Sequence, residues 1–141
     1  MTIARFPYVE VDPSLGAVSA MPYLPIRLIH NQQEVLVSAL VDSGATLNVL
    51  PYDIGQQLGA VWAQQTVPVR LSGNLAACDA RALLVTAQVA DFPAVRLAFA
   101  WTNSNDLPVI LGQINFFLEF DVCFLRSRLL FEIRQRGTAL A

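Results

Sequence analysis

The most informative segment of this chain is Ala-Leu-Val-Asp-Ser-Gly-Ala-Thr, residues 39–46. An apolar strand ends at Val41, the triplet Asp42-Ser43-Gly44 follows, and apolar sequence resumes at once through residues 47–51. Asp-Ser-Gly is by itself a common turn, because aspartate caps its own backbone and glycine relieves the tight geometry. A surface turn rarely lies between two such apolar runs. The sequence therefore places Asp42 at the base of a cleft, and a purely structural turn is the alternative.

Composition limits the classes of protein that the chain can belong to. It has 141 residues, enough for one domain over residues 1–141, and 55% of them are hydrophobic while 14% are charged. A disordered chain would have few apolar residues and many charges. So few charges also predict that some apolar surface is covered by a partner, such as a second copy. All nine basic residues are arginine, the net charge is −2 and no basic tract occurs, so nucleic acid is not an expected partner.

Neither a membrane partner nor a cofactor is expected. No uncharged run reaches the ~20 apolar residues of a membrane span, and no basic segment followed by an apolar one marks a signal peptide. A cytoplasmic location is therefore expected. Cys78 and Cys123 lie far apart and form no metal-like spacing with His30, which predicts two buried, reduced thiols and no metal or organic cofactor.

Period-two alternation of apolar residues predicts a mainly β domain. The turn at residues 30–33 predicts a hairpin, and Ser72-Gly73-Asn74 separates a second pair of strands. Two segments, 51–58 and 113–119, predict short helices; in the second, Ile114, Phe117 and Leu118 share the apolar face. Strands are expected at residues 34–41, 67–71, 81–89, 95–101 and 129–133, the last being either an interior strand or a dimer-interface strand. The expected architecture is all-β and barrel-like.

Two further segments complete a recognisable pattern. An apolar strand, Val109-Ile110-Leu111, ends on Gly112, and residues 114–122 read Ile-Asn-Phe-Phe-Leu-Glu-Phe-Asp-Val. With residues 39–46, these segments resemble the retropepsin-like aspartic proteases, the family of retroviral proteases and their cellular and bacterial relatives. The resemblance covers most of the chain, from about residue 22 to residue 133. It implies a closed, barrel-like retropepsin (acid protease) fold that forms a two-fold homodimer and hydrolyses peptide or protein substrates.

The resemblance also assigns roles to residues. It makes Asp42 the catalytic carboxylate of an active-site loop that continues through Ser43, Gly44, Ala45 and Thr46. Ser43 would brace the two loops of the dimer through its hydroxyl, and Gly44 would leave room for the substrate backbone. The segment Leu71-Ser72-Gly73-Asn74 would be a flap over the bound peptide, and Ile110-Leu111-Gly112 would cross beneath the loop.

The same chemistry predicts that one copy of the chain is not enough. Amide hydrolysis by water needs one carboxylate that removes a proton and another that supplies one, and the chain has a single Asp-Ser-Gly. A homodimer would supply the second Asp42 across a two-fold axis. Retroviral members usually carry an acid where Thr46 stands and an arginine where Gln113 stands, so the usual ion pair is missing here. This departure favours the alternative function, a catalytically silent dimeric module that binds peptides or directs assembly. A third possibility is a domain cut from a longer polypeptide or acting on its own precursor.

Overall fold

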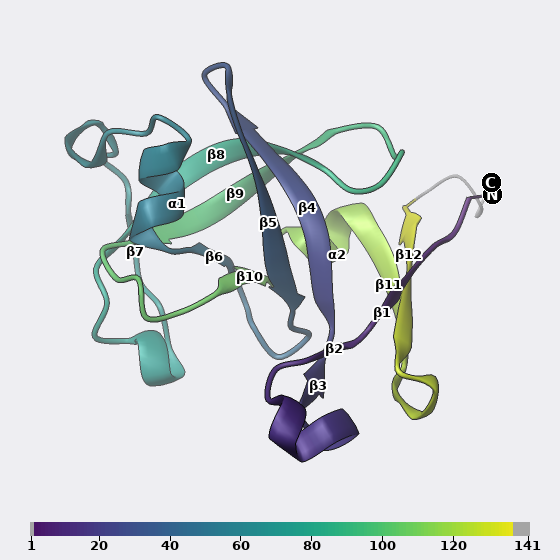
Figure 1. Ribbon diagram of the computed structural model, residues 1–141. Helices are drawn as coiled ribbons and strands as arrows, with labels where there is room; N and C mark the ends of the chain where they lie inside the picture. Colours follow the sequence, from purple (N-terminus) through teal and green to yellow (C-terminus); the bar gives the residue numbers. More distant parts are fainter. Residues whose placement is uncertain (1, 137–141) are drawn as a thin grey trace.

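The computed structural model describes residues 2–136, and within them it consists of strands joined by short helical segments (Figure 1). The strands are β1 (Ala4–Pro7), β2 (Val9–Glu10), β3 (Ala20–Met21), β4 (Tyr23–His30), β5 (Gln33–Val41), β6 (Asn48–Leu50), β7 (Pro68–Val69), β8 (Ala80–Gln88), β9 (Val95–Thr102), β10 (Val109–Leu111), β11 (Phe120–Leu125) and β12 (Leu130–Gln135). The α-helices are α1 (Tyr52–Gln57) and α2 (Phe116–Glu119), and the 3-10 segments are η1 (Pro13–Ser19), η2 (Trp62–Gln64), η3 (Gly73–Leu75) and η4 (Arg126–Arg128).

Six strands close into a barrel. Their order is β4-β5-β10-β6-β9-β8, and a pairing between β4 and β8 joins the two ends of the row. The pairs β5–β10 and β6–β9 are parallel, whereas the long hairpins β4–β5 and β8–β9 are antiparallel. The two-residue strand β7 extends the row beyond β8. This arrangement confirms the predicted all-β, barrel-like fold.

Alternating burial follows directly from the sequence pattern. In β4 the side chains of Leu24, Ile26 and Leu28 are fully buried, and residues 25 and 27 between them are exposed. The predicted hairpin between β4 and β5 is present. Its two central residues, Asn31 and Gln32, both have positive φ (45° and 68°), as the tight turns that suit twisted strands require.

The sequence predicted helix α1 more accurately than helix α2. Helix α1 begins after Pro51 and is followed by Gly59 at φ 77°, as expected. Helix α2 is shorter than expected and begins only at Phe116, because Asn115 has non-helical angles (φ −128°, ψ 12°). The predicted apolar face is therefore only partly right: Phe117 packs against the core, as expected, but Ile114 and Leu118 are exposed and Phe116 is the fully buried residue of the helix.

A second sheet of three strands packs against the barrel in the order β1-β12-β11. The middle strand, β12, buries Phe131 and Ile133 completely, so residues 130–135 form an interior strand of this sheet. Its neighbour β11 leaves Cys123 exposed, while Cys78 is half-buried, and both thiols are free. The prediction of two buried thiols was wrong, because Cys123 lies on the outward side of the alternating strand.

None of the helices within residues 2–136 is long and apolar enough to span a membrane. Over the same residues, no three His, Cys, Asp or Glu side chains gather closely enough to hold a metal ion.

Candidate active site

Asp42 occupies the first position after β5, the strand whose arrowhead points downward in Figure 1. Its backbone N–H donates to the carbonyl oxygen of Leu111 (3.0 Å), and its own carbonyl accepts from Ala45 N–H (3.1 Å). Gly44 N–H donates to the carboxylate oxygen Oδ1 of Asp42 (2.9 Å). The half-buried carboxylate is therefore held in one orientation by the turn that follows it.

The loop after Asp42 lies against the segment that follows β10. Gln113 N–H donates to Ala45 O (2.9 Å), and Ile114 N–H donates to Thr46 O (2.7 Å). The side-chain amide of Gln113 donates to the carbonyl oxygen of Ser43 (2.8 Å). Gln113 thus ties the two segments together without the charge that an arginine would bring.

Gly112 is required where these two segments cross. A Cβ atom at Gly112 would lie 2.5 Å from the carbonyl oxygen of Leu47 and 2.8 Å from that of Ala45. Both atoms belong to the backbone, so neither can move aside as a flexible side chain would. Gly112 therefore lies directly against the loop that carries Asp42, and a glycine is needed there because the two backbones approach closely.

Two asparagines, Asn48 and Asn115, support the Gly112 turn through side-chain hydrogen bonds. Asn48 is completely buried, and its Oδ1 accepts from Gly112 N–H (2.9 Å). Its Nδ2 donates to Ala98 O (3.0 Å) and to Oδ1 of Asn115 (3.1 Å). Asn115 in turn accepts from Ala98 N–H and donates to Arg96 O, both at 3.0 Å. This network joins β6, β9 and the Gly112 turn into one support for the loop that carries Asp42.

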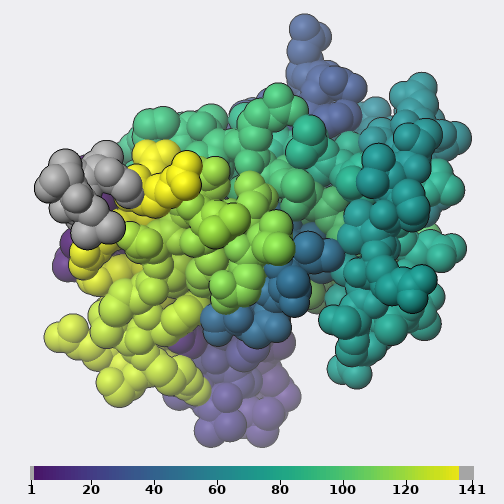
Figure 2. All heavy atoms as spheres, turned by 180° about the vertical axis from the view of Figure 1, so that it is seen from behind, coloured from purple at the N-terminus to yellow at the C-terminus, as the bar shows by residue number. Residues whose placement is uncertain are grey.

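A cleft of about 500 Å³ opens beside Asp42. Its floor contains Gly44, Ala45, Thr46 and the apolar side chains of Leu47, Val49 and Ile110. Residues 70–75 form the opposite wall, and this set includes Leu71, Ser72, Gly73 and Asn74. In Figure 2 the hollow separates the lobe that holds the residues near 70–80 from the rest of the molecule. The structure therefore brings together the Asp42 loop and the predicted flap residues.

The wall of the cleft differs in detail from the predicted strand pair. The ladder between β7 and β8 stops at the pair Val69–Ala80, so Leu71 lies outside the expected strand pair, and a 3-10 turn follows at Gly73–Leu75. Leu71 is buried in a small cluster with Val49, Ala80 and Ala100. Gly73 has φ 64°, so the tip uses its one glycine for a left-handed turn.

Ser43 lies on the other side of the Asp42 carboxylate. It lines a separate groove of about 240 Å³ with Met21, Pro22, Leu40, Val41, Asp42 and Phe124. Asp42 therefore stands between two hollows, and Ser43 is not among the residues that line the larger one. Asp42 is thus reached from both the cleft and the groove.

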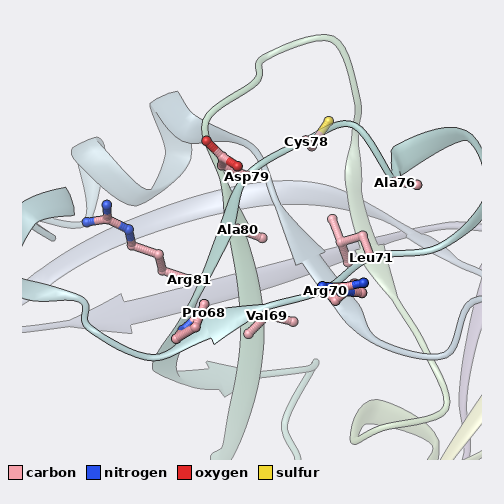
Figure 3. A pocket seen from close by; sticks show the side chains of 9 residues that line it. All are labelled: Pro68, Val69, Arg70, Leu71, Ala76, Cys78, Asp79, Ala80 and Arg81. Atoms are coloured by element: carbon pink, nitrogen blue, oxygen red, sulfur yellow. The ribbon is translucent and has the colours of Figure 1, made fainter.

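A larger cavity, of about 710 Å³, lies outside this site (Figure 3). It is lined by residues 68–71, Ala76 and residues 78–81, and it shares Arg70 and Leu71 with the cleft. Figure 3 shows Arg81 and Asp79 on its rim, pointing apart. Arg81 is already engaged, since it stacks on Trp62 and donates to the carbonyl oxygen of that residue (2.6 Å).

Sequence reasoning missed the two asparagines, Arg70 in the cleft wall, and the groove formed with Met21 and Phe124. Asn48 gave the one usable signal, because it is a polar residue inside the apolar run 47–50. The groove gave none, since the strands that meet there are distant in sequence.

No family model and no curated protein matches this chain. Solved structures do. A retropepsin-like aspartic protease from Rickettsia conorii superposes with a TM-score of 0.62 at 14% identity, over 94% of this chain and 91% of that one. The retroviral protease-like domain of Ddi1 from Leishmania major superposes with a TM-score of 0.58 at 19% identity, over 86% of this chain and 98% of that one. The EIAV protease, in complex with an inhibitor, superposes with a TM-score of 0.51 at 19% identity, over 66% of this chain and 82% of that one. The chain therefore has the retropepsin fold, as predicted from its sequence.

Proposed function

We propose that this protein is an aspartic endopeptidase that works as a homodimer, each copy contributing one Asp42 to a shared site. The observation that carries the proposal is the position of Asp42. Its carboxylate is oriented by Gly44 N–H at the edge of a peptide-sized cleft, and the chain supplies one such carboxylate where the reaction needs two. Like-charged carboxylates about 3 Å apart share one proton, so the pair holds both a base and an acid.

The proposed reaction uses water and no cofactor. The ionised Asp42 takes a proton from a water molecule, whose oxygen bonds to the carbonyl carbon of the peptide. The protonated Asp42 of the other copy gives its proton to the carbonyl oxygen, which forms a tetrahedral diol. The diol then collapses: one hydroxyl proton returns to a carboxylate, the nitrogen takes a proton from the pair, and the C–N bond breaks. The Asp42 pair ends with the one proton that it held at the start.

The substrate that suits the cleft is an extended peptide with apolar side chains beside the cleaved bond. Leu47, Val49, Leu71, Leu75 and Ile110 supply apolar walls. Residues 70–75 would act as the flap. On the floor of the cleft, Thr46 would offer the substrate a neutral hydroxyl, whereas Arg70 gives the opposite wall a positive charge.

The test is hydrolysis of an unstructured protein by wild type, Asp42→Asn and a matched control, Asp91→Asn, from about pH 3 to 7. Asp91 is exposed and lies away from the residues that line the cleft. We expect cleavage by wild type and Asp91→Asn, none by Asp42→Asn, and a rate that rises more steeply than linearly with enzyme concentration. Cleavage that survives in Asp42→Asn would refute the proposal.

The alternative function is a dimeric peptide-binding or assembly module that does not cleave. The absence of charge at Thr46 and Gln113 favours it, since the usual ion pair is gone. Such a module would bind peptides and leave them intact, and Asp42→Asn would leave that binding unchanged. A cytoplasmic location remains a prediction for either function.

A further inference from the structure

The N-terminal segment from Val9 to Met21 leaves the barrel and returns to it as an ordered unit, here called the N-terminal excursion. It consists of the paired strands β2 and β3 with η1 between them, the purple coil at the lower end of Figure 1. Asp12 caps η1 by accepting from Ser14 N–H (3.0 Å), and Ser19 Oγ donates to Asp12 O (3.0 Å). Arg126 of η4 donates to Ala17 O (2.9 Å). These bonds hold the excursion in place although η1 buries none of its residues.

The excursion presents apolar side chains to solvent. Among the residues that the structure describes, the exposed large hydrophobic side chains within it are Val9, Val11, Leu15, Val18 and Met21. Val18 is the most exposed of them, at 82%. No charged residue occurs between Asp12 and Met21. Several exposed apolar side chains on one ordered segment are typical of a protein–protein contact.

The C-terminal end of the excursion lies beside Asp42. Val41 N–H donates to Pro22 O (3.0 Å), so the end of the excursion lies directly on the strand that carries Asp42. Met21 and Pro22 then line the 240 Å³ groove with Asp42, Ser43 and the exposed Phe124. The groove is on the side of Asp42 away from residues 70–75, which cover the substrate cleft.

We infer that the N-terminal excursion is the surface on which a second copy of this chain docks. It lies beside Asp42, and the second copy would supply the other carboxylate of the Asp42 pair. The inference rests on the proposed function, because the reaction requires a second carboxylate about 3 Å from the first. The residues that line the groove beside Asp42, outside the substrate cleft, must then face the partner. In a two-fold dimer the same patch serves both copies, and the self-complementary contact here is apolar. The excursion would supply the low-charge surface that the composition predicts is covered.

The test compares Val18→Asp with Leu36→Asp by sedimentation velocity over a dilution series. Both side chains are exposed, Leu36 at 70%, but Leu36 lies on the barrel strand β5 and outside the groove. We expect the wild type to dimerise, Val18→Asp to raise the dimer dissociation constant at least about ten-fold, and Leu36→Asp to leave it unchanged. Circular dichroism melting checks that each variant is folded. A Val18→Asp variant that fails this check is replaced by Val18→Ser, for which a smaller rise is expected.

The outcomes separate this inference from the proposed function. If Val18→Asp breaks the dimer while the wild-type dimer cleaves nothing, the result supports the proposed docking surface and refutes the proposed endopeptidase function. If Val18→Asp dimerises and cleaves like the wild type, the endopeptidase stands and the docking surface is refuted. A wild type that stays monomeric at high concentration refutes the docking surface. So does a Val18→Asp variant that dimerises normally but binds peptide less well in the Asp42→Asn background, because the patch would then be a substrate surface.

Discussion

Replacing the buried Asn48 should show how much side-chain hydrogen bonds contribute to the stability of the support behind the Asp42 loop. Asn48 makes three, at 2.9, 3.0 and 3.1 Å, and no part of it is exposed. At about 1 kcal/mol for each bond, Asn48→Leu should lower the free energy of unfolding by about 3 kcal/mol, and more where the partners stay unpaired. For a chain of 141 residues this corresponds to a fall in Tm of about 10 °C.

A second variant, Asn48→Asp, adds a pH dependence with a definite sign. It keeps an oxygen for Gly112 N–H, but it replaces the amide donor by an oxygen that faces Ala98 O and Oδ1 of Asn115. Burial beside two acceptors raises the pKa of the introduced carboxyl in the folded state, because only its protonated form can donate. A folded-state pKa above the unfolded one makes the variant most stable below the unfolded pKa of about 3.9 and less stable as the pH rises through the folded value.

The assay is urea unfolding of wild type, Asn48→Asp and Asn48→Leu at several pH values between about 4 and 8, followed by circular dichroism. Asn103→Asp, at an exposed position, is the control and should change stability by less than about 0.5 kcal/mol. The reasoning fails if Asn48→Asp at about pH 8 is within about 0.5 kcal/mol of the wild type, or if its deficit shrinks as the pH rises.

Three further predictions concern close packing and the thiols. Gly55→Ala should lower the free energy of unfolding by about 3 kcal/mol in the same assay, since a Cβ there would lie 2.2 Å from the indole of Trp101; an unchanged midpoint would contradict this packing. Gly112→Ala must displace the carbonyl of Leu47, 2.5 Å from the new Cβ, so we expect cleavage to fall at least about ten-fold even at temperatures where circular dichroism shows a folded protein. The exposed Cys123 should react with a thiol reagent in the native protein faster than the half-buried Cys78 does, and Cys123→Ser should remove the fast phase of the reaction.

The strands and the position of Asp42 could be predicted because they depend on local pattern. Alternation along β4, β5 and β8 marks which side chains face the core, and the Asp-Ser-Gly turn between apolar runs marks the loop. Helix α2 was predicted less well, because the period-3.6 pattern from residue 113 includes Asn115, whose backbone is not helical. Its amide is instead committed to Asn48, Ala98 and Arg96, and contacts so distant in sequence leave no local signal.

The sequence by itself determined the all-β class, the β4–β5 hairpin, the start and end of α1, and the single Asp42 in its turn. Each depends on the residues next to it, through side-chain alternation, turn preference or the chemistry of one short motif. Only the tertiary structure decided that Asp42 separates a substrate-sized cleft from an apolar groove and that Met21 and Phe124 meet there. The packing of the two smaller sheets, β2-β3 and β1-β12-β11, beside the barrel decides these contacts. It brings together chain segments about a hundred residues apart, and no local preference encodes which side chains will then be neighbours.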